Sequence, residues 1–284
     1  MQRVLAADTQ ISSVSEPWLL LPTVYALKKK GGSAEYSHVI ANIALHDFIR
    51  ELPNGKDDYL SAIGGAATEL YRKAAKDKNA RYFLDKTPRY ALIADDVIKM
   101  FPDGKFIVLW RNPLSIIASM VEFWSSGKWD LARFDVDLYN GLANLIDSYR
   151  NNPEKYLAIQ NEHFLKQPEK ELKRISEYLG IEIDTDILNN FSEVKFDGKM
   201  GDTYGVKNYN AVDEAPLEKW KQTINNPLRK RWCRNYLQWL GKERLAVMGY
   251  DLDELLSEID ATEMTTRNLF ADLKCMAFPQ PKYD

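Results

Sequence analysis

Residues 105–119 carry the feature that most constrains the fold: an apolar run ends in an arginine and is followed at once by a helix start. The run is Phe106–Trp110, and after Arg111 come Asn112 and Pro113, which are typical of a helix cap and a first helical position. Apolar residues then recur at the spacing of a buried helix face: Leu114, Ile117, Ala118 and Val121. The segment predicts a buried strand, a tight turn and a helix.

This junction has the features of an anion site. In open α/β sheets ligands bind at the carboxyl ends of the strands, and a helix N-terminus there favours negative charge. Helical spacing puts Ser115 and Ser119 on the face opposite the apolar residues. Arg111 and Ser119 are therefore candidates for a phosphate clamp. The alternative is an arginine that caps a strand and a serine exposed on a helix.

A second junction of the same kind lies upstream. Tyr82–Leu84 is a short apolar run, and Thr87 and Pro88 favour a helix start directly after it. Lys86 thus lies at the same kind of strand end as Arg111. Two cations at neighbouring strand ends predict an electropositive pocket in a chain whose formal net charge is −3.

The remaining segments predict an edge strand and turn over residues 11–18, one further strand and many helices. The apolar run 156–160 favours a strand, and Glu162 after it is expected to tie that turn to the sheet. Residues 17–75 have helical spacing almost throughout, and two or three helices are expected after Leu217. We expect the aromatic residues of the last helices to pack in the core: Trp232, Tyr236 and Trp239.

Both strand–helix junctions resemble those of the PAPS-dependent sulfotransferases, which transfer a sulfonate from 3′-phosphoadenosine 5′-phosphosulfate. That family grips the 3′-phosphate with an Arg and a Ser eight residues apart, the spacing of Arg111 and Ser119. It also has an Asp/Glu-Lys-Thr/Asp-Pro segment, matched here by residues 85–88, whose lysine lies near the transferring sulfonate. The resemblance implies that Arg111 and Ser119 bind the nucleotide and that Lys86 stabilises the leaving PAP.

Two further segments resemble the same family. Glu16, before an expected helix start at Pro17, matches the glutamate that takes the proton of the acceptor hydroxyl in the tyrosylprotein and carbohydrate branch. A base of this kind contributes ~10²–10⁴-fold to the rate; the alternative for Glu16 is an acid stabilised by a helix N-terminus. Segment 196–208 is similar to the loop that covers the nucleotide, which implies PAPS contacts for Lys199 and Gly201; the alternative is a surface loop.

The resemblance implies an α/β fold, a P-loop-NTPase-like parallel sheet of four to five strands flanked by many helices. Family members open with a strand and a Gly-rich loop that cradles the 5′-phosphosulfate, whereas no glycine precedes Gly31 here. We therefore expect the first strand and its loop to be missing and the complete protein to start earlier. The expected organisation is one N-terminally truncated sulfotransferase-like domain over 1–260 and a tail over 261–284.

Composition excludes several classes of protein. A chain of 284 residues that is 45% hydrophobic and 28% charged is typical of a globular domain. Its two cysteines, Cys233 and Cys275, argue against a disulfide framework and favour a reducing, cytoplasmic location. No apolar run approaches the ~18 residues of a membrane span, and a pI near 5.8 argues against nucleic acid as a partner. The three histidines form no metal-ligand pattern, so no metal is expected.

The sequence thus predicts transfer of a sulfonate from PAPS to a hydroxyl of a small-molecule or carbohydrate acceptor. Phenols, alcohols, lipid-linked sugars and peptidyl tyrosine are further acceptors that the pattern leaves open, and it does not predict an oligomeric state. Two alternatives belong to other classes. One is a catalytically silent PAP- or nucleotide-binding protein, and the other is a P-loop kinase relative with a Walker loop and acidic Mg²⁺ ligands.

Overall fold

Short apolar runs form four parallel strands in the part of the chain that the computed structural model describes, residues 1–31, 35–76, 80–196, 212, 214 and 216–278. Strand β1 (Ile11–Ser13) pairs with β2 (Tyr82–Leu84), and β3 (Phe106–Trp110) pairs with β4 (Tyr156–Gln160). The last three strands have the predicted bounds. The expected α/β class with parallel strands is confirmed, and the hydrogen-bonded strands form two ladders of two.

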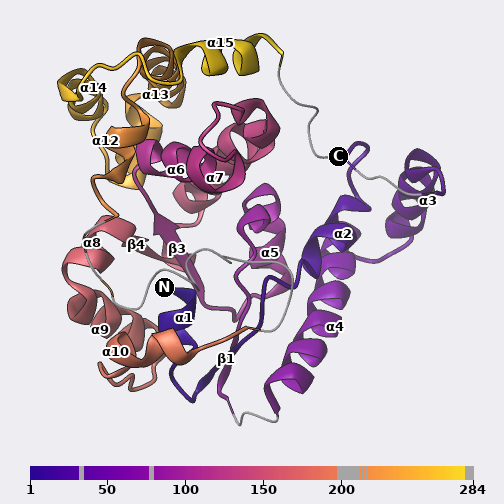
Figure 1. Ribbon diagram of the computed structural model, residues 1–284. Coiled ribbons are helices and arrows are strands. Elements are labelled where there is room, and N and C mark those ends of the chain that lie inside the picture. The colour runs from indigo at the N-terminus through magenta and orange to yellow at the C-terminus, as the bar shows by residue number, and fades with distance from the viewer. Residues whose placement is uncertain (32–34, 77–79, 197–211, 213, 215, 279–284) are drawn as a thin grey trace. The chain divides into compact units, whose positions relative to one another are not determined.

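The two ladders belong to two units of the chain, each with its own set of helices (Figure 1). The first unit consists mainly of Met1–Lys105 and Ser176–Ala211, and it contains β1 and β2. The second consists mainly of Phe106–Ile175 and Val212–Tyr283, and it contains β3 and β4. None of the described helices combines the length and the apolar character that crossing a membrane requires.

In the first unit, helix α4 packs against both strands and against α5 (Figure 1). Gly64 of α4 allows this close approach, because a Cβ there would lie 2.1 Å from the carbonyl oxygen of Met100. The helices of the unit, including the 3₁₀ segments η1 and η6, are α1 (Gln2–Leu5), α2 (Leu20–Tyr25), α3 (His38–Arg50), α4 (Lys56–Lys76), η1 (Pro88–Ile93), α5 (Ala94–Met100), α10 (Ile187–Asn190) and η6 (Phe191–Glu193).

The predicted helix start at Pro17 is wrong. Trp18 has a φ of 52°, in the left-handed region that a right-handed helix cannot contain, and α2 begins only at Leu20. The helix after Lys86 is also less regular than expected, because it opens as the 3₁₀ segment η1 and becomes α-helical only at Ala94. The segment 14–19 is therefore an irregular loop between β1 and α2.

In the second unit, helices α6, α7, α12 and α13 surround a core that includes the buried Trp110 of β3. Helix α9 (Pro168–Leu179) begins in this unit and ends in the first. The other helical segments are α6 (Pro113–Ser119), the π segment η2 (Met120–Trp124), η3 (Leu131–Phe134), the π segment η4 (Val136–Gly141), α7 (Leu142–Asn151), η5 (Pro153–Lys155), α8 (Asn161–Lys166), α12 (Lys219–Thr223), α13 (Pro227–Met248), α14 (Leu252–Ala261) and α15 (Leu269–Ala277).

The aromatic set of α13 packs as predicted at two of its three positions. Tyr236 is 2% exposed, and its ring stacks on that of Trp232 with centroids 5.4 Å apart. Tyr236 also stacks on Trp239, whose ring lies at the edge of the core and is 38% exposed. The stacked column joins α13 to η4 through Tyr139, whose ring lies edge-on to that of Tyr236.

The segment 261–284, expected as a tail, contains the helix α15, which a buried ion pair attaches to α13. Asp272 of α15 is fully buried and accepts two hydrogen bonds from Arg229, Nε at 2.6 Å and Nη2 at 2.9 Å. The same guanidinium donates to the carbonyl oxygens of Thr223 and Gly127. A buried arginine needs these acceptors, so the helix carrying Asp272 is part of the second unit.

We predict that Asp272→Ala lowers the free energy of unfolding by about 3–5 kcal/mol, because it leaves the Arg229 guanidinium buried without its carboxylate. Urea denaturation measures the change. The matched control is Asp253→Ala, which breaks an ion pair with Lys242 whose side chains are 69% and 68% exposed and should leave the midpoint unchanged. Equal midpoint shifts in the two variants would contradict this role of the buried pair.

Candidate functional site

Glu16 and Lys86, the two predicted catalytic residues, form an ion pair in the first unit. Ser13 of β1 pairs with Leu84 of β2, so the residues that follow both strands leave the same edge of the ladder. The Lys86 ammonium donates to Oε1 of Glu16, and the Trp18 indole N–H donates to Oε2 at 3.4 Å. The Glu16 side chain is 10% exposed and that of Lys86 is 35% exposed.

This geometry argues against one of the two interpretations of Glu16, that of an acid stabilised by a helix N-terminus. Helix α2 begins four residues after it, at Leu20, so Glu16 does not lie in the first turn of a helix and has no stabilisation from a helix N-terminus. Its oxygens instead have an ammonium and an indole N–H as partners. A carboxylate is also a group that can accept a proton from a hydroxyl within hydrogen-bond distance.

Asp85, next to Lys86, is the centre of a hydrogen-bond cluster that sequence reasoning missed. Its Oδ2 accepts from the hydroxyls of Tyr71, at 2.5 Å, and Tyr90, at 2.9 Å. Its Oδ1 accepts from Thr87 Oγ1 at 2.9 Å, so the Thr87 side chain bonds to Asp85 rather than capping the following helix. Asp85 could have been singled out from the sequence, because it belongs to the 85–88 motif. The spacing of Tyr71 and Tyr90 in the sequence does not indicate that their hydroxyl groups bind Asp85.

Burial controls the protonation of this cluster. Removal from water raises the pKa of Asp85, and the hydroxyl donors only partly offset that effect. Burial, followed by the neighbouring Asp85 charge, raises the pKa of Tyr90 to about 12 and that of Tyr71 further. Both phenols therefore keep their protons at neutral pH and act as hydrogen-bond donors.

In the second unit, Arg111 and Ser119 lie at the two ends of α6. Arg111 follows the last residue of β3, and the next residue, Asn112, caps α6 as predicted by accepting from the backbone N–H of Leu114 at 2.8 Å. Ser119 is the last residue of α6 and is partly exposed. The expected exposure of Ser115 is wrong, because this residue is buried, with 5% of its surface exposed.

Glu162 ties its turn to the sheet as the sequence predicts. One carboxylate oxygen accepts from the backbone N–H of Asn112 at 2.9 Å, and the other accepts from the Tyr250 hydroxyl at 2.6 Å. Burial, followed by Glu162, raises the pKa of Tyr250, while the Arg111 charge opposes the rise. Arg111 directly precedes Asn112, whose N–H binds Glu162. Sequence reasoning missed Tyr250, which is 88 residues from Glu162.

A glycine allows Tyr250 to reach this position. Gly249 ends α13 with a φ of 84°, and a Cβ there would lie 2.3 Å from Nε2 of Gln160. That amide donates to the carbonyl oxygens of Gly249 and Met248, at 3.0 and 3.1 Å. Gln160 is the last residue of β4, so the end of the strand holds the end of α13 beside Arg111 and Glu162.

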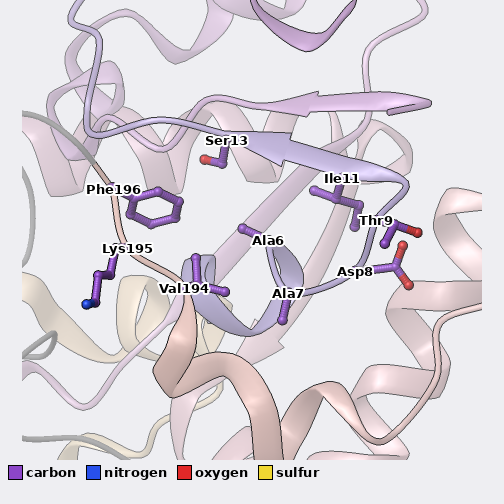
Figure 2. A pocket seen from close by; sticks show the side chains of 9 residues that line it. All are labelled: Ala6, Ala7, Asp8, Thr9, Ile11, Ser13, Val194, Lys195 and Phe196. Carbon is purple, nitrogen blue, oxygen red and sulfur yellow. The ribbon is translucent and has the colours of Figure 1, made fainter. Parts of the chain in front are cut away.

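Other predicted features lie elsewhere or outside the described residues. Lys199 and Gly201 both lie outside the described residues. A cavity of about 270 Å³ in the first unit is lined by residues 6–9, which follow α1, by Ile11 and Ser13 of β1 and by residues 194–196 (Figure 2). Neither Glu16 nor Lys86 lines it, and Ser13, which does, donates its hydroxyl hydrogen to the carbonyl oxygen of Leu84 at 2.7 Å.

Comparison with known proteins gives the family. The model of the sulfotransferase family matches residues 1–186, about two thirds of the chain, and the chain belongs to that family. It is 21% identical over 279 residues to the nodulation protein NoeE of Sinorhizobium fredii, covering 88% of this chain and 62% of that protein.

A second relative and a solved structure agree. A "putative protein-tyrosine sulfotransferase" of Caenorhabditis briggsae is 23% identical over 172 residues, covering 58% of this chain and 59% of that protein. The chain thus spans about three fifths of the length of these two relatives. The sulfotransferase domain of the curacin biosynthetic pathway has the same fold, with a TM-score of 0.50 and 18% identity over 78% of this chain and 85% of that one.

We predict that Glu162→Ala lowers the free energy of unfolding by about 2 kcal/mol, because the Asn112 amide and the Tyr250 hydroxyl lose a shared acceptor. Urea denaturation of the full chain measures it. Glu154→Ala is the control, since that exposed glutamate of η5 should change stability by less than about 0.5 kcal/mol. A loss at Glu162 no larger than at Glu154 would remove the structural role.

Proposed function

We propose that this sulfotransferase-family chain moves a sulfonate from PAPS to a hydroxyl of an acceptor, giving PAP and a sulfate ester. The observation that carries the proposal is the contact of Glu16 with Lys86 at the edge where β1 and β2 end. A proton acceptor and a cation side by side are the two groups that sulfonate transfer needs. The family membership supports the class of reaction.

In the proposed step, the acceptor oxygen attacks sulfur in line with the bond to the leaving group. The new bond joins that oxygen to sulfur, the bond between sulfur and the bridging oxygen breaks, and its electron pair stays on PAP. The hydroxyl proton passes to the Glu16 carboxylate. Lys86 stabilises the charge that develops on the bridging oxygen, so positioning and electrostatics supply most of the acceleration, as in phosphoryl transfer.

Nucleotide binding is assigned to Arg111 and Ser119, which hold the 3′-phosphate in this proposal. A guanidinium contributes strong, charge-assisted hydrogen bonds to a phosphate. The capped turn of Asn112 and the bond from its N–H to Glu162 keep the backbone at Arg111 in one conformation, which supports the assignment. Lys199 and Gly201 are proposed as further contacts to the same nucleotide.

The acceptor class is proposed from the base. A glutamate at position 16 favours a carbohydrate or tyrosyl hydroxyl over a small phenol, and the name of the Caenorhabditis briggsae relative, a "putative protein-tyrosine sulfotransferase", supports including tyrosyl peptides. Cys233 and Cys275 are both free thiols, which fits the proposed reducing, cytoplasmic location.

We predict that Arg111→Ala weakens PAP binding at least about tenfold, because a charge-assisted phosphate contact is lost. Isothermal calorimetry with PAP and the full chain measures the affinity. Arg150→Ala is the matched control, since that arginine of α7 is exposed and pairs with Asp147. PAP binding by wild type that Arg111→Ala leaves unchanged would sink the clamp, and no PAP binding at all would sink the proposed function.

We predict that Glu16→Gln lowers the rate at which PAP is formed from PAPS by about 10²-fold or more, because an amide accepts no proton. The affinity for PAP should be retained.

We predict that Lys86→Ala lowers the rate of PAP formation more than it lowers the affinity for PAP, because Lys86 stabilises the charge on the leaving group. The assay uses an oligosaccharide, a phenol and a tyrosyl peptide as acceptors, with Glu69→Gln, an exposed glutamate of α4, as control. PAP binding without turnover on any acceptor would favour the silent nucleotide-binding alternative.

A further inference from the structure

Residues 86–90 hold the loop that carries Glu16 at three successive points. Lys86 pairs with Glu16, and the Arg89 guanidinium lies 5.6 Å from the centre of the Trp18 ring. At the end of the loop, the backbone N–H of Leu20 donates to the Tyr90 hydroxyl at 3.2 Å. The two segments therefore run side by side, with contacts spread over the whole loop rather than at the ion pair alone.

The last of these contacts is anchored on a buried group. The Tyr90 hydroxyl donates its own hydrogen to Oδ2 of Asp85 at 2.9 Å while it accepts from Leu20. A hydroxyl group carries one hydrogen, so Tyr90 donates that hydrogen to the Asp85 carboxylate and uses a lone pair of its oxygen to accept from the Leu20 amide. Asp85 is itself held from α4 by the Tyr71 hydroxyl at 2.5 Å, and Tyr71 stacks on Phe83 of β2 with ring centroids 4.7 Å apart.

We propose that Tyr90 is a positioning residue of the transfer reaction: its hydroxyl, anchored on Asp85, sets the place of the loop that carries Glu16. The inference rests on the proposed function, because it gives Glu16 the role of base. Tyr90 acts through Leu20 and the loop, and it is not assigned a contact with either substrate.

The reason is the backbone amide that Tyr90 holds. Leu20 is the first helical residue of α2, and the N–H groups of a first turn have no acceptor within their own helix. Tyr90 supplies that acceptor and so fixes the start of α2, which lies four residues after Glu16 in the sequence. Because a misplacement of ~1 Å at a reacting group costs ~10²-fold in rate, loss of one hydroxyl is expected to reach the chemistry.

Two tyrosines on one carboxylate oxygen provide a matched pair of variants. Tyr90→Phe and Tyr71→Phe each remove one hydroxyl donor from Oδ2 of Asp85 and keep the ring. Only Tyr90 also accepts from Leu20. If the Asp85 cluster only stabilises the fold, the two variants should have similar effects on the loop that carries Glu16. If Tyr90 positions this loop, Tyr90→Phe should have the larger effect.

The first readout is the ¹H–¹⁵N resonance of the Trp18 indole, which donates to Glu16 and is assigned through Trp18→Phe. We expect Tyr90→Phe to shift or broaden this resonance and to lower PAPS turnover by about tenfold or more, with PAP affinity retained. We expect Tyr71→Phe to change the resonance and the turnover much less than Tyr90→Phe does, because the bond between Tyr90 and Leu20 remains. A resonance unchanged in both variants, or shifted equally in both, would overturn the proposal.

A second measurement on the wild-type chain keeps the test decisive if Tyr90→Phe does not fold. The Leu20 amide should exchange with D₂O more slowly than the exposed amides of the same loop, because Tyr90 is its acceptor. Exchange as fast as in the loop would overturn the positioning role. If wild type turns over no PAPS, the proposed function fails, while the indole and exchange data still decide whether Tyr90 holds the loop.

Discussion

A carboxylate removed from water needs hydrogen-bond donors for its oxygens, and both units are built around this requirement. In the first unit, Asp85 follows β2 and accepts from hydroxyls of α4, of η1 and of the turn between strand and helix. In the second, Glu162 follows β4 and accepts from the Asn112 amide and the Tyr250 hydroxyl. Each acid thus joins chain segments that are far apart in sequence at the carboxyl end of a parallel strand.

The ends of β2 and β3 carry the cations of the proposed chemistry. Lys86 directly follows Asp85 in the sequence, and Arg111 follows β3, which pairs with the strand that precedes Glu162. The carboxylate of Asp85 accepts hydrogen bonds from hydroxyl groups, and that of Glu162 accepts from a backbone amide and a hydroxyl group.

Local signals predicted much of the secondary structure and little of its irregularity. Strands β2, β3 and β4 have the expected bounds because each is an apolar run between turn residues. The helix start at Pro17 failed because the left-handed Trp18 follows it, a conformation set by the contacts of the loop. The segment after 261 lacked clear periodicity, yet α15 forms there because Arg229 needs the carboxylate of Asp272.

By itself, the sequence determined the two strand–helix junctions, and with them the positions of Lys86 and Arg111 at strand ends, because runs, caps and turns are properties of neighbouring residues. Tertiary structure alone decided the partners. The contact of Lys86 with Glu16 spans 70 residues, and that of Tyr90 with Leu20 also spans 70. Such pairs form only when parallel strands bring their ends to one edge of the sheet. The local spacing of residues does not predict which side chain from a distant part of the sequence lies there.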